Sequence, residues 1–387
     1  MRVGLVYDLR RDYLEMGFSE EQTAEFDSEE TIDTLADTLS SLGHEVHRVG
    51  SIYELLRLLA QGITWDLVFN IAEGLYGRSR EAQVPALLEA FNIPYTFSDP
   101  LTLALALDKA MAKRVLRSNG VPTPDFFTIS SMEEAENPGL PFPLFVKPVS
   151  EGTGKGITAS SIVRNGAELK NQCQKLLARY NQPVLAEAYL PGSEVTVGIL
   201  GTGGKARVLG VLEVKLLKNA EPGVYSYINK ELCEERVKYS LLKTRKLAEE
   251  AGELALRAWR ALGCRDAGRV DIKAGPAMVE GGRAPGGRAP AGRLAGDGLY
   301  VLEINPLAGL HPTHSDLPIL CARAGISYND LIKGILDSAL ERGGPFRGRS
   351  AGGTRRMDAH PPGHDARRDM DARRDTGPVG STVPRVN

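Results

Sequence analysis

The chain contains little cysteine. Its 387 residues include four cysteines, and no two of them form a C-x-x-C pair. This spacing excludes a disulfide framework and a common zinc site, because both need clustered cysteines. We expect four reduced, buried thiols, as in a cytoplasmic protein: Cys173, Cys233, Cys264 and Cys321.

An excess of one charge sign and long apolar runs are also absent. The formal net charge is −2, so no basic excess is available to neutralise nucleic acid or a membrane surface. No apolar run approaches the length needed to span a bilayer. The apolar segment 3–7 is too short for a signal peptide and predicts a first strand. We therefore expect a cytoplasmic protein with neither nucleic acid nor a membrane as its partner.

The most informative segment present is 300–306, Tyr-Val-Leu-Glu-Ile-Asn-Pro. Side chains alternate between the faces of a strand, so Glu303 and Asn305 are predicted to share one face. Asp271 belongs to a second alternating segment that can pair beside the first. Three such oxygen donors suit Mg²⁺, which takes its remaining ligands from water and nucleotide phosphates. Either pair alone also fits an ordinary sheet with a polar face turned to water.

The first hundred residues alternate strand-like and helix-like segments. Strands are expected at 3–7, 44–49 and 66–70, and helices at 30–42 and 53–59. This alternation predicts a parallel sheet flanked by helices, a Rossmann-like domain over 1–100, with ligands near the carboxyl ends of the strands. The charged segment 8–27 predicts a long loop with about one helical turn.

The rest of the chain is predicted to form a central lobe, 101–186, and a C-terminal lobe, 187–345. Strands are expected at 143–148, 157–163, 184–189, 194–201 and 207–215, and helices at 106–118, 167–180 and 241–262. Residues 279–297, rich in Gly, Arg, Ala and Pro, are expected to be a flexible insertion, and 346–387 a disordered tail. Neither has enough apolar residues to offset the entropy of ordering.

A glycine-rich turn, 150–156, follows the apolar segment 144–148. Glycine lets the backbone approach a polyanion and present consecutive N–H groups to phosphate oxygens. The pattern is neither a Walker loop nor a dinucleotide fingerprint, and such a turn alone is also typical of a plain hairpin. Lys147 favours the phosphate interpretation, because a lysine flanked by Val146 and Pro148 is expected to meet an anion.

The segment 187–194, Glu-Ala-Tyr-Leu-Pro-Gly-Ser-Glu, ends one predicted strand and starts another. Its extended backbone could offer N–H and C=O groups to an adenine edge, with an aromatic face nearby. Its two carboxylates could accept hydrogen bonds from an exocyclic amine and from ribose hydroxyls. Without the other motifs, the segment is a generic turn.

Together these motifs resemble the ATP-grasp carboxylate–amine ligases, and within them the D-alanine–D-alanine ligases. The patterns K-P, the glycine-rich loop, E-x-Y-L-x-G-x-E, R-x-D and L-E-I-N-P follow one another in the family's order within residues 1–340. The resemblance implies an α/β protein: a Rossmann-like N-terminal domain, then the two-lobed ATP-grasp fold with ATP between its lobes.

The resemblance also implies a role for each matching residue. ATP would be bound by Lys109, Lys147, Gly152, Thr153, Gly154, Glu187, Ala188, Tyr189, Leu190, Glu194 and Lys230. Asp271, Glu303 and Asn305 would bind two Mg²⁺ ions, with Mn²⁺ as the alternative ion. Arg269, the backbone of Gly309 and Ser150 would assist catalysis.

The implied chemistry joins two amino acids through a peptide bond. ATP would phosphorylate a carboxylate, with Mg²⁺ and lysines neutralising the transferring phosphoryl group. An amine would then attack the acyl phosphate, while Arg269 and the Gly309 amide stabilise the oxyanion. Small amino acids and ATP are the expected ligands, and a homodimer is one expected assembly.

Two alternatives stay open at this point. One is a related ligase that joins other amino acids or a small carboxylate to an amine. The other is a catalytically silent nucleotide-binding homologue, which the retained motif residues disfavour.

The sequence departs from the family near the expected substrate. Where the ligases have a His-Gly pair, this chain has Glu73 before Gly74. The family's first-domain glutamate corresponds to either Glu25 or Glu29, because the insertion before them obscures the match. An acidic pocket would favour a substrate richer in positive or polar groups than alanine, although D-alanine stays an option.

The last loop, 311–318, contains two unusual histidines, His311 and His314. Each is either a substrate contact or a polar loop residue. With Glu73, we expect His314 and Ser315 to contact the substrate.

Overall fold

The computed structural model describes residues 1–221, 223–224, 226–276 and 298–342. The predicted insertion at 279–297 and the predicted tail at 346–387 lie outside these ranges. Among the helices described, none is both long and apolar enough to cross a membrane.

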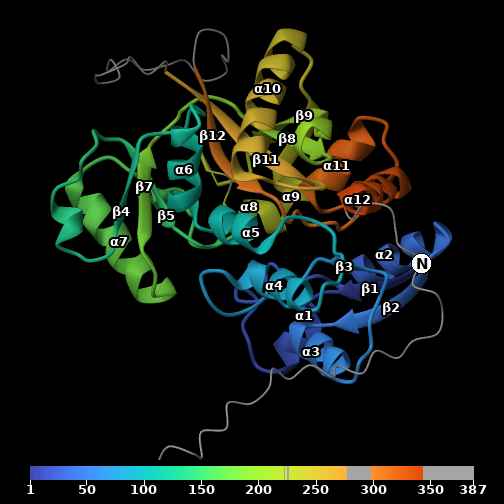
Figure 1. The fold of residues 1–387 in the computed structure, drawn as a ribbon. Helices are drawn as coiled ribbons and strands as arrows, with labels where there is room; N and C mark the ends of the chain where they lie inside the picture. Colours follow the sequence, from blue (N-terminus) through green and yellow to red (C-terminus); the bar gives the residue numbers. More distant parts are fainter. Residues whose placement is uncertain (222, 225, 277–297, 343–387) are drawn as a thin grey trace, which may run out of the picture. The chain divides into compact units, whose positions relative to one another are not determined.

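The first sheet has three parallel strands in the order β2-β1-β3 (Figure 1). Its elements are β1 (Arg2–Val6), α1 (Arg10–Glu15), α2 (Glu29–Ser41), β2 (Glu45–Gly50), α3 (Ile52–Ala60), β3 (Leu67–Asn70) and α4 (Gln83–Ala90). Leu5 packs in one cluster with Leu35 of α2, whereas Val6 packs in another with Leu55 of α3. Alternate side chains of β1 thus meet helices on both faces. The predicted parallel sheet is confirmed, and so is the single short helix after β1.

Two helices replace the one predicted over 106–118. They are α5 (Pro100–Leu107) and α6 (Lys109–Ser118). The break lies at Asp108, whose backbone is extended and whose side chain accepts a hydrogen bond from the Met111 N–H at 2.9 Å. An aspartate at this position satisfies an N–H that helix geometry leaves open. Lys109 therefore stands at the first residue of α6.

The second sheet is antiparallel, in the order β4-β7-β5-β6. Its elements are β4 (Phe126–Ile129), β5 (Leu144–Pro148), β6 (Ile162–Val163), α7 (Gly166–Tyr180) and β7 (Val184–Ala188). The strand predicted over 157–163 is reduced to two residues. Thr158 and Ser161 exchange side-chain to backbone hydrogen bonds that cap a short 3-10 turn over Ala159–Ser161, so that part does not pair.

The third sheet has five antiparallel strands in the order β10-β9-β8-β11-β12. Its strands are β8 (Glu194–Leu200), β9 (Arg207–Leu216), β10 (Val237–Leu241), β11 (Ala267–Gly275) and β12 (Gly298–Asn305). The helices of this part are α8 (Tyr227–Glu231), α9 (Cys233–Arg236), α10 (Arg245–Leu262), α11 (Asp316–Arg323) and α12 (Tyr328–Arg342). The prediction of a helix from residue 241 was wrong at its start, because residues 237–241 pair with β9 and α10 begins four residues after β10 ends.

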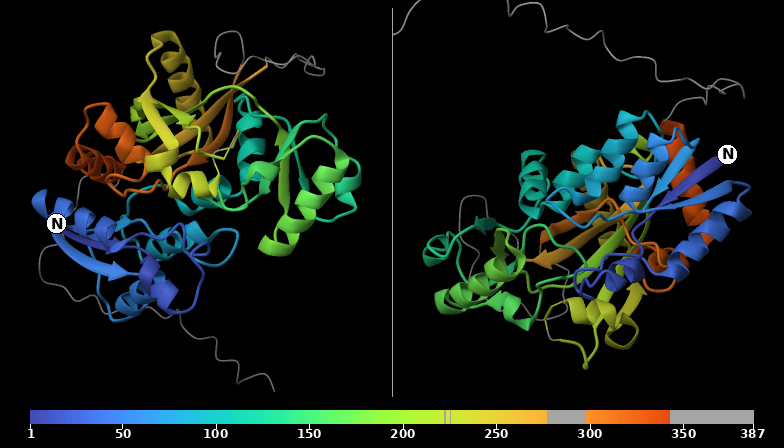
Figure 2. Two further views of the ribbon diagram at one scale, coloured as in Figure 1. Left: turned by 180° about the vertical axis from the view of Figure 1, so that it is seen from behind. Right: turned by 90° about the horizontal axis from the view of Figure 1, so that it is seen from below.

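Strand β8 shows how this sheet is covered on both sides. Val197 packs in the cluster that contains Trp259 of α10. On the other face, a Cβ at Gly198 would lie 2.8 Å from Leu320 of α11. Helix α10 thus covers one face and α11 approaches the other, an arrangement that can be followed in the views of Figure 2. Polar side chains of β11 and β12 occupy the face opposite α10.

Candidate functional site

The centre of the candidate site is the antiparallel pair β11–β12. Asp271 stands opposite Glu303, and Arg269 stands opposite Asn305. The register shifts after Asp271, so Leu302 is an extra residue that bulges from the ladder. Val270 and Ile304 are buried on the α10 side. The predicted pairing and the shared face of Glu303, Asn305 and Asp271 are confirmed, while their part in binding a metal stays a prediction.

Asp271 is surrounded by hydrogen-bond donors. Its two carboxylate oxygens lie 2.8 and 2.7 Å from Nη1 of Arg269. Oγ1 of Thr196 donates to Oδ1 at 2.8 Å, and Nδ2 of Asn305 donates to Oδ2 at 3.1 Å. Burial raises the pKa of Asp271, and the Arg269 guanidinium acts against that rise. Because Asn305 donates through Nδ2, its Oδ1 is the atom that it can offer to an ion.

Glu303 has cationic neighbours instead. Its carboxylate lies 3.5 Å from Nζ of Lys109. Burial alone would raise the pKa of Glu303, but Lys109, Lys147 and further cations together lower it below its usual range. The carboxylate is therefore held ionised, as an ion ligand has to be.

The donor set fits a magnesium ion that also takes ligands from a nucleotide. No group of three or more His, Cys, Asp or Glu side chains that could hold a metal occurs within the described ranges. Two carboxylates and an amide oxygen are hard donors but too few to complete six-fold coordination. Mg²⁺ commonly completes its coordination with phosphate oxygens and water.

Two buried lysines share one carboxylate beside this pair of strands. Nζ of Lys147 lies 3.1 Å from Glu187, and Nζ of Lys113 lies 2.9 Å from the same side chain. All three residues are buried: Lys147 is 4% exposed, Lys113 is 1% exposed and Glu187 is 2% exposed. One carboxylate cannot neutralise two ammonium groups, so buried positive charge is left over. A polyanion is the ligand that would balance it.

The glycine-rich turn packs tightly against its neighbours. Gly154 has a φ of +72°, and a Cβ there would lie 2.9 Å from the backbone nitrogen of Tyr227. A Cβ at Gly152 would collide with the carboxylate of Glu25. The turn also holds Lys109, whose ammonium donates to the carbonyl of Glu151. Both glycines are thus required by space or by backbone conformation.

Three adjoining cavities line up along these residues. The first, which we call the intersheet cavity, lies between side chains of β5 and β7 and side chains of β8, β11 and β12. It is lined by Phe145, Lys147, Ile157, Glu187, Ala188, Tyr189, Leu190, Glu194, Gly223, Val224, Lys230, Asp271, Lys273, Leu302 and Glu303. Apolar side chains such as Phe145, Ile157 and Leu190 form part of its wall, and seven of its fifteen lining residues are charged. The cavity therefore suits a molecule that has both an apolar face and polar groups.

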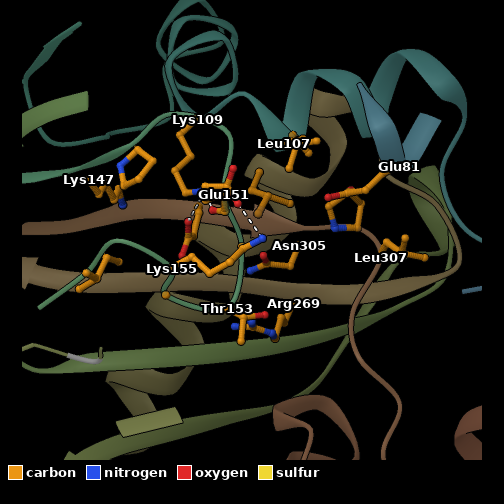
Figure 3. Close-up of a pocket in the computed structure, with 18 of the residues that line it drawn as sticks. Glu81, Leu107, Lys109, Lys147, Glu151, Thr153, Lys155, Arg269, Asn305 and Leu307 are labelled. Atoms are coloured by element: carbon orange, nitrogen blue, oxygen red, sulfur yellow. Dashed lines mark hydrogen bonds and ion pairs between the residues drawn. The ribbon is translucent and has the colours of Figure 1, made fainter. Parts of the chain in front are cut away.

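The second cavity, the lysine cavity, adjoins the first. Lys109, Lys147, Lys155 and Lys230 line it together with residues 152–154, Arg269, Glu303 and Asn305 (Figure 3). It shares Lys147, Ile157, Lys230 and Glu303 with the intersheet cavity. This arrangement concentrates positive charge beside the predicted ion ligands.

The third cavity, the acidic cavity, has a volume of about 380 Å³. Five carboxylates line it: Glu25, Asp27, Glu73, Glu81 and Asp316. It shares Lys230, Arg269, Asn305 and Glu81, among others, with the lysine cavity. Lys230 lines all three cavities.

The predicted site residues are distributed over these cavities, with one exception. The predicted adenine and ribose residues line the intersheet cavity, and the predicted substrate residues Glu73, His314 and Ser315 line the acidic cavity, as Gly309 does. Ser150 is not among the lining residues, and its carbonyl accepts a hydrogen bond from Arg80 at 2.9 Å. Its catalytic role stays a prediction.

The structure separates the two candidates for the first-domain glutamate. Glu25 lines the acidic cavity and lies 2.9 Å from Arg80 and 2.9 Å from Nζ of Lys155. Glu29 is exposed at the start of α2, where its partner is Arg11. Only Glu25 is therefore in position to meet a ligand of this cavity.

The loop before α11 is braced by its own side chains. The His311 N–H donates to Oγ of Ser315 at 3.0 Å, and a Cβ at Gly309 would lie 2.7 Å from that oxygen. Nδ1 of His311 accepts hydrogen bonds from the N–H groups of Thr313 and His314. The Gly309 N–H has no hydrogen-bond partner among the residues described here. His311 thus acts as a loop brace, and the Gly309 amide is available to a ligand.

Several residues at or beside the cavities were given no role in the sequence analysis. Glu81, Lys155 and Lys273 line the cavities, whereas Arg80 and Lys113 contact the lining residues Glu25 and Glu187. Lys273 lies 2.9 Å from Glu194 in the intersheet cavity. Lys273 could have been predicted from the sequence, because it lies two residues after Asp271 in a strand and therefore shares its face. Arg80 and Lys155 meet Glu25 across 55 and 130 residues of sequence, which no local pattern indicates.

Comparisons with known proteins agree with this geometry. A family model described as "D-ala D-ala ligase C-terminus" matches residues 115–278. The chain is 32% identical over 325 residues to an uncharacterized protein of Sinorhizobium fredii, covering 80% of this chain and 87% of that protein. It is 33% identical over 307 residues to the D-alanine–D-alanine ligase of Bordetella avium, covering 78% of this chain and 87% of that ligase.

Solved structures show the same fold. The crystal structure of D-alanine–D-alanine ligase from Bacillus anthracis complexed with ATP has a TM-score of 0.62 and 24% identity to this chain. The match covers 89% of this chain and 98% of that one. The fold is therefore that of the ATP-grasp enzymes. Since the Bordetella relative is matched over most of both sequences, the chain belongs to the D-alanine–D-alanine ligase family.

Proposed function

We propose that this chain joins two amino acids through a peptide bond in an ATP-dependent reaction with an acyl-phosphate intermediate, with D-alanine as the first substrate to test. The observation that supports this most strongly is the row of three adjoining cavities. A pocket with apolar walls, a cluster of lysines and an acidic cavity follow one another, and Lys230 lines all of them. This order matches a nucleoside, its phosphates and an amine-bearing substrate.

The nucleotide would extend from the intersheet cavity into the lysine cavity, between the proposed lobes 101–186 and 187–345. The backbone of Ala188 and Leu190 would face the base, and Glu194 the ribose. Lys109, Lys147 and Lys230 would contact the phosphates. Their positive charge stabilises a transferring phosphoryl group, on which negative charge spreads over three oxygens.

Asp271, Glu303 and Asn305 would hold magnesium, two ions in the family's pattern, with manganese as a substitute. When bound, the metal would neutralise phosphate charge and orient the phosphoryl group. Glu303 contributes a carboxylate that its lysine neighbours keep ionised.

Arg269 and the Gly309 amide would act on the second step. Arg269 is held in place by Asp271 at 2.7 Å and by Asp316 at 3.4 Å. Both Arg269 and Gly309 line the acidic cavity. When an amine attacks the acyl phosphate, the carbonyl oxygen gains negative charge, which a fixed guanidinium and an open N–H can stabilise.

The test is ADP release with purified protein, ATP, Mg²⁺ and D-alanine, followed by mass spectrometry of the product. We expect one dipeptide for each ADP. Glu303→Gln should lower turnover by roughly a hundredfold or more, because an amide cannot replace an ionised ligand. Glu213→Gln is the matched control, since Glu213 is a partly buried sheet glutamate with a lysine partner, Lys215, at 2.9 Å, outside the three cavities.

ATP binding without turnover would contradict the proposal and favour a silent homologue. ADP release that needs no amino acid would also contradict the proposal, because it would mean that the chain only hydrolyses ATP. We also propose a cytoplasmic location, where ATP is available to the reaction. Association into a homodimer stays a prediction, which light scattering on the purified protein tests.

A further inference from the structure

The acidic cavity contains three carboxylates without a protein partner. Glu81 is 9% exposed and lines both the lysine cavity and the acidic cavity. Figure 3 shows it across the lysine cavity from Lys147. Among the described residues, the carboxylates of Glu81, Glu73 and Asp27 have no hydrogen bond and no ion pair, although all three line the cavity. Glu81 is buried, and Glu73 and Asp27 are half-buried. A carboxylate that loses much of its water without gaining a donor is costly, so a ligand is expected to supply the missing donors.

The other two carboxylates of the cavity are already paired. Glu25 has Arg80 and Lys155 as partners, and Asp316 has Arg269. The three without partners are thus additional to the ion pairs that organise the site. Burial raises the pKa of Asp27 to about 8 and, with the help of neighbouring carboxylates, that of Glu81 to about 7 and that of Glu73 well above its ordinary value. This rise fits a cation site seen without its cation.

A metal ion does not fit the three carboxylates. No cluster of acidic, His or Cys side chains close enough to hold an ion occurs in the described part of the chain. The carboxylates are spread along a cavity of about 380 Å³, a volume in the range of small-molecule sites. Separate cationic groups on one organic molecule match this spread better than a single ion.

The number of charges separates alanine from a basic amino acid. Two alanines bring two ammonium groups, and the attacking amine has to lose its proton before the bond forms. Arg10, Lys230 and Arg269 also line the cavity, but none of them forms an ion pair with any of the three carboxylates among the described residues, and Arg10 and Arg269 pair with other carboxylates. At most two of the three carboxylates would then find a cation on the substrates. Glu73 stands where the family has a histidine. Its carboxylate can only accept hydrogen bonds when ionised, whereas an imidazole could also donate one, so this change favours a substrate that brings a donor. A third cationic group on the substrate would complete the pairing.

We infer that one of the two amino acids joined by this chain has a cationic side chain, as lysine and ornithine do, which supplies the third cation for the three carboxylates of Asp27, Glu73 and Glu81. This inference rests on the proposed ligase function and specifies its substrate class. The reaction itself is unchanged: the carboxylate gains the phosphoryl group of ATP, the amine displaces phosphate, and the side-chain ammonium only binds.

Lysine and norleucine provide a matched pair of probes, because they have similar length and differ in the terminal charge. ADP release is measured for both enantiomers of lysine, ornithine, norleucine and alanine. We expect lysine or ornithine to exceed norleucine in kcat/KM by about tenfold or more, the effect of a charge-assisted hydrogen bond. In Glu73→Gln and Asp27→Asn this ratio should fall toward one. Glu29→Gln, an exposed glutamate outside the cavity, is the control and should keep the ratio.

A binding measurement separates the two proposals. With Mg²⁺ and a non-hydrolysable ATP analogue, lysine should raise the melting temperature of the full chain more than norleucine does, and less so in Glu73→Gln. If alanine is ligated and basic amino acids have no advantage in either assay, the inference is wrong and the ligase function stands. If lysine binds selectively but no amino acid elicits ADP, the ligase function is wrong and the cation site stands.

Discussion

At the residue scale, the shared carboxylate of Glu187 has the clearest consequence. It lies within 3.1 Å of Lys147 and 2.9 Å of Lys113, so the site has one ammonium more than it can pair. ATP would bind to this surplus of positive charge. Removing one lysine should therefore weaken nucleotide binding more than it weakens the fold.

We predict that Lys147→Met lowers ATP affinity by roughly ten- to a hundredfold, the effect of losing one charge-assisted hydrogen bond. The fold should persist, because Lys113 still pairs with Glu187 and a methionine fills similar space. Calorimetric titration with ATP and Mg²⁺ measures the change. Lys170→Met, an exposed lysine on α7, serves as the control. An unchanged affinity would make Lys147 a purely structural residue.

At the element scale, the glycine-rich turn between β5 and β6 controls where the phosphates can lie. Its Gly154 has a left-handed backbone and approaches Tyr227 closely. An alanine there would meet both the strain of a positive φ and the backbone of α8. The turn would have to move away from the lysine cavity.

Gly154→Ala should therefore raise the KM for ATP several-fold and lower stability by about 1 kcal/mol or more. Gly204→Ala is a matched control, because a Cβ at that glycine meets nothing within 4 Å and its φ is not positive. Steady-state kinetics and urea unfolding of both variants provide the measurements. Equal behaviour of the two variants would show that the turn tolerates a side chain and does not need its present path.

The elements also show what sequence patterns can predict. The alternation of apolar and polar residues in β11 and β12 was sufficient to predict the face that carries the candidate ion ligands. Because side chains alternate along each strand and the two strands pair, Asp271, Glu303 and Asn305 share one face. The helix predicted from 106 was wrong because Asp108 caps a new helix at Lys109. The predicted strand over 157–163 was mostly lost to the cap at Thr158. In both cases a short polar side chain accepts a hydrogen bond from a nearby backbone N–H. The spacing of apolar residues does not indicate such a bond.

At the scale of the whole molecule, Glu25 connects distant parts of the chain. It belongs to the long segment after β1, and its partners are Arg80 before α4 and Lys155 in the glycine-rich turn. Burial would raise the pKa of Glu25, but Arg80 and Lys155 outweigh burial and lower it to about 2. No local pattern could predict this contact, because Arg80 and Lys155 lie 55 and 130 residues from Glu25 in the sequence.

This connection predicts an acid-dependent loss of stability. A carboxylate with a lowered folded-state pKa stabilises the protein above its unfolded pKa, near 4.5, and that contribution is lost as pH falls toward 2. Glu25→Gln should therefore lower the free energy of unfolding by on the order of 3 kcal/mol at pH 6, as breaking a buried ion pair does. The difference from the wild type should shrink as pH falls from 5 to 3.

Denaturant unfolding at several pH values measures this difference. Glu45→Gln, an exposed glutamate of β2 without an ion pair among the described residues, is the control. A difference that stays constant with pH would mean that Glu25 acts through packing and not through its charge.

The central claim for the whole molecule is that ATP phosphorylates the carboxylate of an amino acid before the peptide bond forms. The most direct test uses D-alanine, or the preferred amino acid, with both carboxylate oxygens replaced by ¹⁸O. One labelled oxygen should leave with phosphate and the other should stay in the peptide carbonyl, so mass spectrometry should find one ¹⁸O in each phosphate released. Phosphate without the label would mean that water cleaves ATP, and it would contradict the account.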